Sequence, residues 1–274
     1  MSKKTVNAYL HGYSQTEQNR LRYQASFNEQ RIYQDVDFSR VKKLLEVGCG
    51  VGAQSEILMR RFPKLRLTGV DLNEQQLESA KKYLEAKEYL SERYEIHKMD
   101  ASNLSFDSNE FDGAFLCWVL EHVPSPQKVL AEVRRVLCPG SKIFITEVLN
   151  SSFFLDPYSP NVWKYWMEFN DYQLDMGGDP FIGAKLGNLL LSSGYQNIQT
   201  HVRTMFFDNR SPEERKETIE FWTDLLMSAK DFLIQEGRVN EELADAAQKE
   251  LRAVARDPNA VFYFNFIQAQ AKVF

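Results

Sequence analysis

A short run of glycines and an acid further along the chain are spaced to bind a nucleoside. Gly48, Gly50 and Gly52 alternate with other residues in one turn. Glycine has no Cβ atom, so the chain can turn sharply there and a ligand can approach its backbone. Asp71 follows 19 residues after Gly52, and a carboxylate in that position can accept hydrogen bonds from both hydroxyls of an unphosphorylated ribose. The spacing therefore predicts a nucleoside site.

The glycine spacing differs from that of a dinucleotide site. The dinucleotide fingerprint is G-x-G-x-x-G, in which a helix N-terminus points at a pyrophosphate. Here the turn reads G-C-G-V-G-A, so the third glycine comes one residue too early. Glu46 precedes the turn, and its carboxylate would repel a phosphate but would suit a cation or an amine. The pattern favours a nucleoside ligand without a pyrophosphate.

Alternating strands and helices would place these residues at one edge of a parallel sheet. Val41, Leu44, Leu45 and Val47 give residues 41–47 the apolar character of a strand that helices cover on both faces. Residues 66–70 form a second strand that ends at Asp71, and open α/β sheets bind ligands at the carboxyl ends of their strands. Apolar residues at helical spacing predict helices over residues 74–86 and 126–137. This order of elements predicts a doubly wound parallel sheet of the α/β class.

Four segments together resemble the class I S-adenosylmethionine-dependent methyltransferases. Glu46 to Gly52 is similar to the first motif of that family, E/D-x-G-x-G-x-G. The other segments resemble the family's third strand, its fourth strand with the following turn, and the entry to its fifth strand; they are residues 99–106, 111–123 and 137–145. They follow one another in the family's order. The chain resembles in particular the bacterial and archaeal small-molecule type, with a methyltransferase domain of the 11 or 25 kind.

The resemblance implies a fold and a cofactor. The fold is a Rossmann-like, seven-stranded, mostly parallel sheet with an antiparallel last strand, to which this chain adds helical and aromatic cap elements. The cofactor is S-adenosyl-L-methionine. Residues 1–40 would form an N-terminal helical lid and residues 41–149 the cofactor-binding core. Residues 150–274 would complete the sheet, with cap insertions at 150–182 and 208–259.

The resemblance also assigns cofactor contacts residue by residue. The residues expected to contact the cofactor are Glu46, Gly48, Cys49, Gly50, Asp71, Leu72, Asp100, Ala101, Cys117 and Trp118 from the core, with Tyr13 and Arg20 from the N-terminal segment. Three of these assignments have alternatives. Asp71 could instead cap the next helix, and Asp100 could belong to an ordinary turn. The cysteines could simply fill the core.

The N-terminal segment carries a resemblance of its own. Tyr9 to Ser14 and the residues that follow are similar to the G-[HY]-S-x-x-E-x-x-R-L-x-x-Q opening of some bacterial small-molecule methyltransferases. In those enzymes the segment folds over the cofactor, so Tyr13 and Arg20 would reach the methionine carboxylate, with Gln24 nearby. The alternative is a loose chain end whose helix, over residues 14–34, only packs on the sheet.

Methyl transfer from a sulfonium needs little acid–base help, because the leaving group is a neutral thioether. The protein mainly has to align the reacting atoms and exclude water. Glu147, at the end of the fifth strand, and His122, after the fourth, are the candidate general bases for a phenol or an acidic carbon. His122 could equally begin a structural helix, in which case catalysis would rest on positioning alone. The histidines show no metal-ligand spacing, and we expect no metal site.

Aromatic residues are concentrated after the core. Residues 150–182 hold nine of them together with three prolines, a composition that could roof a pocket. An amphipathic helix that packs on the core, through Trp163, Trp166 and Phe169, explains the pattern equally well. Residues 208–259 form an insert between the sixth and seventh strands that is longer than a hairpin needs, and the sequence predicts two helices in it, over residues 213–235 and 241–255.

The composition of the chain limits the kinds of partner and the location that we expect for it. The formal charge of −5 over 274 residues, with a pI near 5.6, argues against nucleic acid, which would need a basic stripe. No apolar run approaches the length of a membrane span, and the start of the chain lacks a signal peptide's apolar region. Three cysteines without C-x-x-C spacing suggest reduced thiols, hence a cytoplasmic protein.

The sequence thus predicts an enzyme that transfers a methyl group from S-adenosylmethionine to oxygen, nitrogen or carbon of a small, lipophilic or aromatic molecule. Cys117 to Leu120 stand where a DNA or amide methyltransferase would carry an Asn-Pro-Pro-Tyr-like motif. A non-catalytic regulator that binds the cofactor remains an alternative. A nicotinamide-dependent oxidoreductase is disfavoured by the early third glycine and by the lack of a Tyr-x-x-x-Lys motif. A homodimer through the 208–259 insert or the N-terminal helix stays open.

Overall fold

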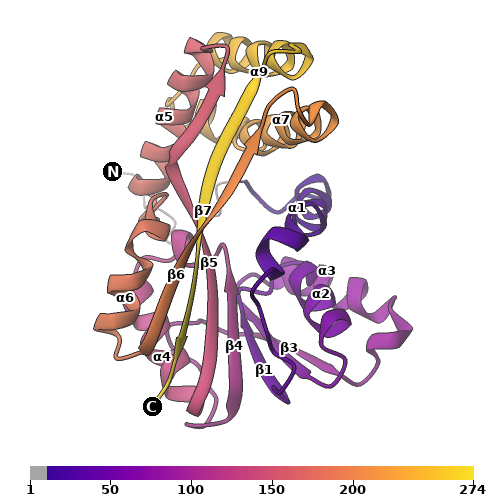
Figure 1. Cartoon of the computed structure of the whole chain (residues 1–274), viewed down its shortest axis with the longest axis vertical. Helices are drawn as coiled ribbons and strands as arrows, with labels where there is room; N and C mark the ends of the chain where they lie inside the picture. Colours follow the sequence, from indigo (N-terminus) through magenta and orange to yellow (C-terminus); the bar gives the residue numbers. More distant parts are fainter. Residues whose placement is uncertain (1–10) are drawn as a thin grey trace.

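A seven-stranded sheet forms the centre of the computed structural model, which describes residues 11–274. The strand order is β3-β2-β1-β4-β5-β7-β6, and β7 alone runs antiparallel to both of its neighbours (Figure 1). The strands are β1 (Lys43–Val47), β2 (Arg66–Asp71), β3 (Tyr94–Lys98), β4 (Phe111–Cys117), β5 (Leu137–Asp156), β6 (Gln196–Phe207) and β7 (Val261–Lys272). The sequence prediction of a doubly wound sheet with an antiparallel last strand is confirmed.

Helices cover both faces of the core sheet. One face carries α1 (Gln15–Tyr33), α2 (Ala53–Arg61) and α3 (Glu74–Glu85), and the other carries α4 (Pro126–Val136) and α6 (Leu186–Ser192) (Figure 1). Alternate residues of β1 serve the two layers, since Leu44 packs into the first and Leu45 into the second. This explains why Leu44 and Leu45 are both apolar, because a strand buried on both faces has no side turned to water.

The long strands continue beyond the core and carry the cap. β5 runs on to Asp156, and its last residues pair with β7 after a register shift between Leu149 and Phe154. The strand therefore extends past residue 149, where the sequence pattern placed its end. Residues 150–156 lengthen the sheet, and helix appears only at α5 (Pro160–Asp175).

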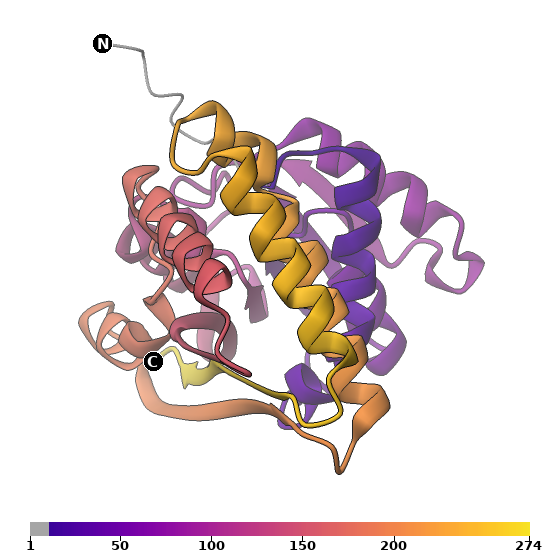
Figure 2. The ribbon, with the colours of Figure 1, turned by 90° about the horizontal axis from the view of Figure 1, so that it is seen from above.

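The insert between β6 and β7 is helical. It contains α7 (Pro212–Met227), α8 (Lys230–Gln235) and α9 (Glu241–Arg256), so the helix expected over residues 213–235 is interrupted. Ser228 lies in the interruption, and its hydroxyl donates to the carbonyl oxygen of Leu225 at 2.7 Å. Viewed from above, α9 crosses between α5 and α1 (Figure 2).

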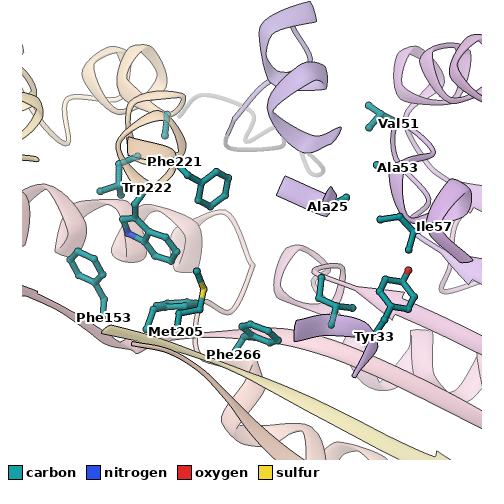
Figure 3. Close-up of a cluster of buried hydrophobic side chains, with 14 of the residues drawn as sticks. Ala25, Tyr33, Val51, Ala53, Ile57, Phe153, Met205, Phe221, Trp222 and Phe266 are labelled. Atoms are coloured by element: carbon teal, nitrogen blue, oxygen red, sulfur yellow. The ribbon is translucent and has the colours of Figure 1, made fainter. Parts of the chain in front are cut away.

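One hydrophobic cluster joins the cap to the core. Figure 3 shows Phe153 and Trp222 from the cap in the same cluster as Tyr33 and Ile57 from the core helices. The rings of Phe153 and Trp222 stack with their centroids 5.7 Å apart. The cap is thus packed on the core through apolar contacts as well as through the shared strands. Among the described residues, no helix is both long and apolar enough to cross a membrane.

Candidate active site

A cavity of about 790 Å³ opens at the carboxyl ends of β1, β2 and β4, where the parallel core meets the cap. Its walls come from the glycine turn after β1, the loops after β2, β3 and β4, and helices α1, α5 and α7. Volumes of this size are typical of sites for cofactors and small molecules.

The glycine turn lies on the cavity wall, and its glycines cannot be replaced without strain. Gly48 and Gly50 have φ of +70° and +50°, in the left-handed region that favours glycine. A Cβ on Gly48 would lie 2.5 Å from the Val119 side chain, whereas a Cβ on Gly50 would have no heavy atom within 4 Å. The backbone at Gly50 is therefore open to a ligand, as predicted.

Asp71 also lines the cavity. Its Oδ2 accepts a hydrogen bond from the Gly50 N–H, and its Oδ1 accepts one from the Asn73 N–H, each at 2.9 Å. Asn73, rather than Asp71, caps α3 by accepting from the Gln76 N–H. Burial raises the pKa of Asp71, and the two N–H donors oppose this rise. Each carboxylate oxygen keeps a second lone pair for a ligand hydroxyl.

The predicted adenine contacts lie next to Asp71. Leu72, Asp100 and Ala101 all line the cavity, and Leu72 is 44% exposed. Asp100 Oδ1 accepts hydrogen bonds from the backbone N–H and the hydroxyl of Ser102, each at 2.8 Å. The ordinary turn considered from the sequence is therefore present, and it holds Asp100 at the cavity.

Trp118 and the two core cysteines complete this side. Cys49, Cys117 and Trp118 line the cavity. Trp118 has φ of +56°, which is rare for a residue with a large side chain. Its backbone N–H donates a hydrogen bond to the carbonyl oxygen of Thr146. Backbone strain of this kind is found chiefly at functional sites.

Glu46 is the one expected cofactor residue that lies outside the cavity lining. Its side chain is buried, and its Oε2 accepts a 2.5 Å hydrogen bond from the Ser55 hydroxyl on α2. Burial raises the pKa of Glu46 to about 8. In the structure Glu46 contacts Ser55 of α2. A direct contact between Glu46 and a ligand stays a prediction.

The two candidate bases are placed differently. His122 lines the cavity, and its Nε2 lies 3.7 Å from Glu121 Oε1. Glu147 is buried outside the lining, and its carboxylate accepts hydrogen bonds from the N–H groups of Val119, Leu120 and Glu121. Burial, together with the nearby Glu121, raises the pKa of Glu147. Glu147 thus holds the turn that contains Trp118 and His122 in place through these hydrogen bonds.

The N-terminal segment closes the cavity from the side of α1. Tyr13, Arg20 and Gln24 line it, and their contact with the methionine carboxylate stays a prediction; Tyr9 and Leu10 of that motif lie outside the described residues. The Arg20 guanidinium donates to both carboxylate oxygens of Glu17 and to Gln24 Oε1. The Tyr13 carbonyl oxygen accepts a hydrogen bond from Gln75, which ties the segment to α3.

Aromatic side chains from the cap enclose the far end of the cavity, which we call the acceptor chamber. Its apolar walls are Trp166, Phe169, Phe221, Trp222, Phe264 and Phe266. Trp166 and Phe169 thus do both things weighed from the sequence, because they pack on the core and also roof the pocket. The contributions of α7 and β7 were missed, although the alternating aromatics of residues 262–266 were the available signal. His11 also lines the cavity, although the sequence analysis assigned no role to it within the Tyr9 to Ser14 segment.

Within the described residues no cluster of histidine, cysteine and acidic side chains could hold a metal ion. The lining combines polar groups at the carboxyl ends of β1, β2 and β3 with the aromatic side chains of the acceptor chamber. Backbone N–H groups and the Asp71 carboxylate are groups that a nucleoside site would use, and their role as cofactor contacts stays a prediction.

Comparisons with known proteins agree with this geometry. Residues 45–145 match the profile of the family described as methyltransferase domain. A sterol 24-C-methyltransferase from Gibberella zeae is 35% identical over 112 residues, which cover 41% of this chain and 29% of that protein. A demethylmenaquinone methyltransferase from Desulfitobacterium hafniense is 30% identical over 142 residues, covering 51% and 53%. The matched residues thus span about half the length of the second relative and less than a third of the first.

Solved structures share the fold over most of the chain. A [4+2]-cyclase, SpnF, superposes with a TM-score of 0.60 at 18% identity, covering 91% of this chain and 82% of that one. A phosphoethanolamine N-methyltransferase from Haemonchus contortus, solved with S-adenosyl-L-methionine, gives 0.59 at 17% identity, covering 95% and 57%. With the sheet order, the glycine turn and the sequence match in agreement, residues 45–145 form a methyltransferase domain of the class I, S-adenosylmethionine-dependent type.

Proposed function

We propose that the protein transfers a methyl group from S-adenosylmethionine to a small, lipophilic or aromatic acceptor. The observation that carries this proposal is a single cavity in which the glycine turn and Asp71 adjoin an acceptor chamber with aromatic walls. When bound, the cofactor supplies an activated methyl group on a sulfonium, whose departure as a neutral thioether needs no acid.

The residues of the chain would act mainly by binding and positioning. Gly48 and Gly50 leave the backbone open beside Asp71, which would hold the ribose. The aromatic walls of the acceptor chamber would exclude water and orient an apolar molecule against the cofactor. The Arg20 guanidinium is paired with the Glu17 carboxylate, which weakens its attraction for an anionic acceptor. The aromatic walls therefore favour an uncharged acceptor.

The location and partners belong to the same proposal. The three cysteines form no disulfide, which supports a cytoplasmic location. The net charge of −5 supports a small-molecule acceptor over nucleic acid. A homodimer stays a prediction. The second candidate function is a protein that binds the cofactor without methyl transfer. The fold match to a [4+2]-cyclase supports this alternative, because it shows that the same fold also occurs in a protein named for a different reaction.

Calorimetric titration with S-adenosylhomocysteine is the first test. We expect saturable binding by the wild type, loss of at least tenfold in affinity for Asp71→Ala, and no change for Asp107→Ala, an exposed acid outside the cavity. NADH should not bind. Binding of NADH, or equal affinity in all three proteins, would contradict the assigned cofactor site.

Turnover is tested separately, with S-adenosylmethionine carrying a labelled methyl group and a panel of phenols, quinols, amines and sterols. Label transferred to an extractable, apolar product supports the enzyme. Cofactor binding without transfer to any acceptor, including a lipid extract, would favour the regulator instead.

A further inference from the structure

Two side-chain amides on the cavity wall have a role that the proposed function has not yet used. Asn150 belongs to the extension of β5 and Gln173 to α5, and both line the cavity. Only 4% of each residue is exposed, so the little of each amide that is open lies at the cavity. Gln173 comes from the same helix as Trp166 and Phe169, two aromatic walls of the acceptor chamber.

The hydrogen bonds around Asn150 fix the orientation of its amide. The Trp166 carbonyl oxygen can only accept, so the side-chain nitrogen of Asn170 must face it, at 2.6 Å. The side-chain oxygen of Asn170 is therefore turned to Asn150, whose Nδ2 donates to it at 2.8 Å. Because its nitrogen is engaged in this way, the Asn150 side chain presents Oδ1 on its other side.

The amide of Gln173 is oriented by the same reasoning. Its Nε2 donates to the carboxylate of Glu121 at 2.9 Å and to the backbone carbonyl oxygen of Glu121 at 3.3 Å. A backbone carbonyl cannot donate, so the nitrogen must face Glu121. Gln173 Oε1 therefore points away from Glu121.

Both amide oxygens lack a donor. Within residues 11–274 nothing donates a hydrogen bond to Asn150 Oδ1 or to Gln173 Oε1. Neither oxygen is one of the fully enclosed side-chain atoms without a partner, so both keep accessible surface. Since the two residues are otherwise buried, that surface faces the cavity. A ligand in the acceptor chamber thus meets two hydrogen-bond acceptors set among aromatic side chains.

Two indole N–H groups of the same walls are not open to a ligand. Trp166 Nε1 donates to the Asn150 backbone carbonyl oxygen at 3.3 Å, and Trp222 Nε1 is enclosed by its neighbours. A molecule that is wholly apolar, or whose only polar atoms are ether or ketone oxygens, would seal the two amide oxygens from water without supplying a donor. Such sealing costs free energy, so the wall disfavours molecules of this kind.

We propose that Asn150 and Gln173 select an acceptor that carries an uncharged hydrogen-bond donor, a hydroxyl or an N–H group, on its aromatic or lipophilic body. This inference rests on the proposed function and narrows its acceptor class. The two oxygens accept from the donor group, while the aromatic walls hold the rest of the molecule. A side-chain amide is not a base at neutral pH, so the two residues determine specificity and take no part in proton transfer.

Two matched pairs of aromatic molecules test this preference in the wild-type protein. The pairs are 2-naphthol with 2-methylnaphthalene and indole with benzofuran, whose members have nearly the same shape and differ in whether they carry a donor. The first pair reports on a hydroxyl and the second on an N–H group. In calorimetric titrations, with and without S-adenosylhomocysteine, the donor of at least one pair should bind about tenfold more tightly than its partner. Equal or reversed affinities in both pairs, or no binding by any of the four, would overturn the inference.

Two variants assign the preference to the amides. Asn150→Leu and Gln173→Met each remove one amide oxygen with little change in side-chain volume. Each should lower the preference for the donor about fivefold to tenfold, with S-adenosylhomocysteine affinity unchanged within about threefold. Gln54→Met is the matched control, because Gln54 lines the same cavity but its Oε1 already accepts from the Tyr33 hydroxyl at 2.8 Å. An unchanged preference in both amide variants, or an equal fall in the control, would overturn the inference.

These outcomes separate the inference from the proposed function. The titration of the wild type decides the inference even where a variant does not fold. Equal affinities within both pairs, in a protein that binds S-adenosylhomocysteine, would remove the requirement for a donor and leave the methyltransferase intact. Failure to bind S-adenosylhomocysteine would instead contradict the proposed function, and the preference among the four probes would still measure the chamber by itself.

Discussion

At the scale of single residues, the buried acids differ in what they serve. Asp71 reaches the cavity, while Glu46 and Glu147 are buried behind it and bind the protein itself. The glycine spacing and the acid after the second strand predicted the first of these, because backbone approach and ribose recognition need those residue types. Residue type alone could not separate the other two from ligand contacts, since a carboxylate beside a turn can face either the ligand or a neighbouring helix.

Glu46→Gln should stabilise the unliganded protein in a pH-dependent way. The pKa of Glu46 is about 8 in the folded protein and 4.5 ordinarily, so the folded state binds more protons between these values and the wild type loses stability as pH rises from about 4.5 to 8. Glutamine keeps an oxygen for Ser55 and has no charge to bury. We expect little difference in the free energy of unfolding at pH 4.5 and a gain of roughly 4–5 kcal/mol at pH 8.5.

The control for this prediction is Glu88→Gln, an exposed glutamate, which should have little effect at either pH. An equal change in melting temperature at the two pH values would show that burial of the ionised Glu46 carboxylate does not destabilise the protein.

At the scale of elements, the turn from Trp118 to His122 depends on Glu147. Glu147→Gln should retain methyl transfer within a few fold, because glutamine resembles the protonated carboxyl and keeps an oxygen for the N–H groups of Val119 and Leu120. Glu147→Ala leaves these groups unsatisfied and should lower the free energy of unfolding by about 2–5 kcal/mol. Urea unfolding and turnover measurements check both. A large loss of turnover in Glu147→Gln with normal stability would restore Glu147 as a general base.

The segment before α1 is held by a close contact at Gly12. A Cβ there would lie 3.3 Å from the Phe232 ring, at φ of +69°. We expect Gly12→Ala to displace His11 and Tyr13 and to weaken S-adenosylhomocysteine binding about tenfold. Gly140→Ala is the matched control: its φ is +87°, but its Cβ would meet nothing within 4 Å. It should cost about 1 kcal/mol in stability and leave affinity unchanged. Equal affinities in the two variants would count against the contact.

Periodicity predicted most of these elements, because each buries a regular apolar stripe or face. It did not predict the extension of β5 beyond residue 149, where the register shift interrupts the alternation and where the polar run Asn150–Ser152 reads as a loop. The break between α7 and α8 was also missed, since Ser228 differs from an ordinary helical serine only through its tertiary contact with His11.

At the scale of the whole molecule, cap and core should unfold together. They share the strands of one sheet, and one hydrophobic cluster runs from the core helices into the cap, so the cap has no hydrophobic core separate from the rest. Leu251→Ala, at a fully buried position on α9, should cost about 2–5 kcal/mol. Circular dichroism and tryptophan fluorescence, which reports chiefly on the cap, should lose signal at the same lowered temperature. A separate early transition in fluorescence would show that the cap is an independent unit.

The continuous strands β5 and β7 have a consequence for selectivity. A cap on a flexible linker can swing and adapt to guests of different size, but here the frame of the acceptor chamber is built on the same hydrogen-bonded ladder as the core. The chamber is therefore preformed and does not close around its ligand. Little conformational entropy is lost when a molecule of matching shape binds, and a larger molecule cannot be accommodated by movement of the cap. A change of acceptor would require substitution of the side chains that form the chamber walls.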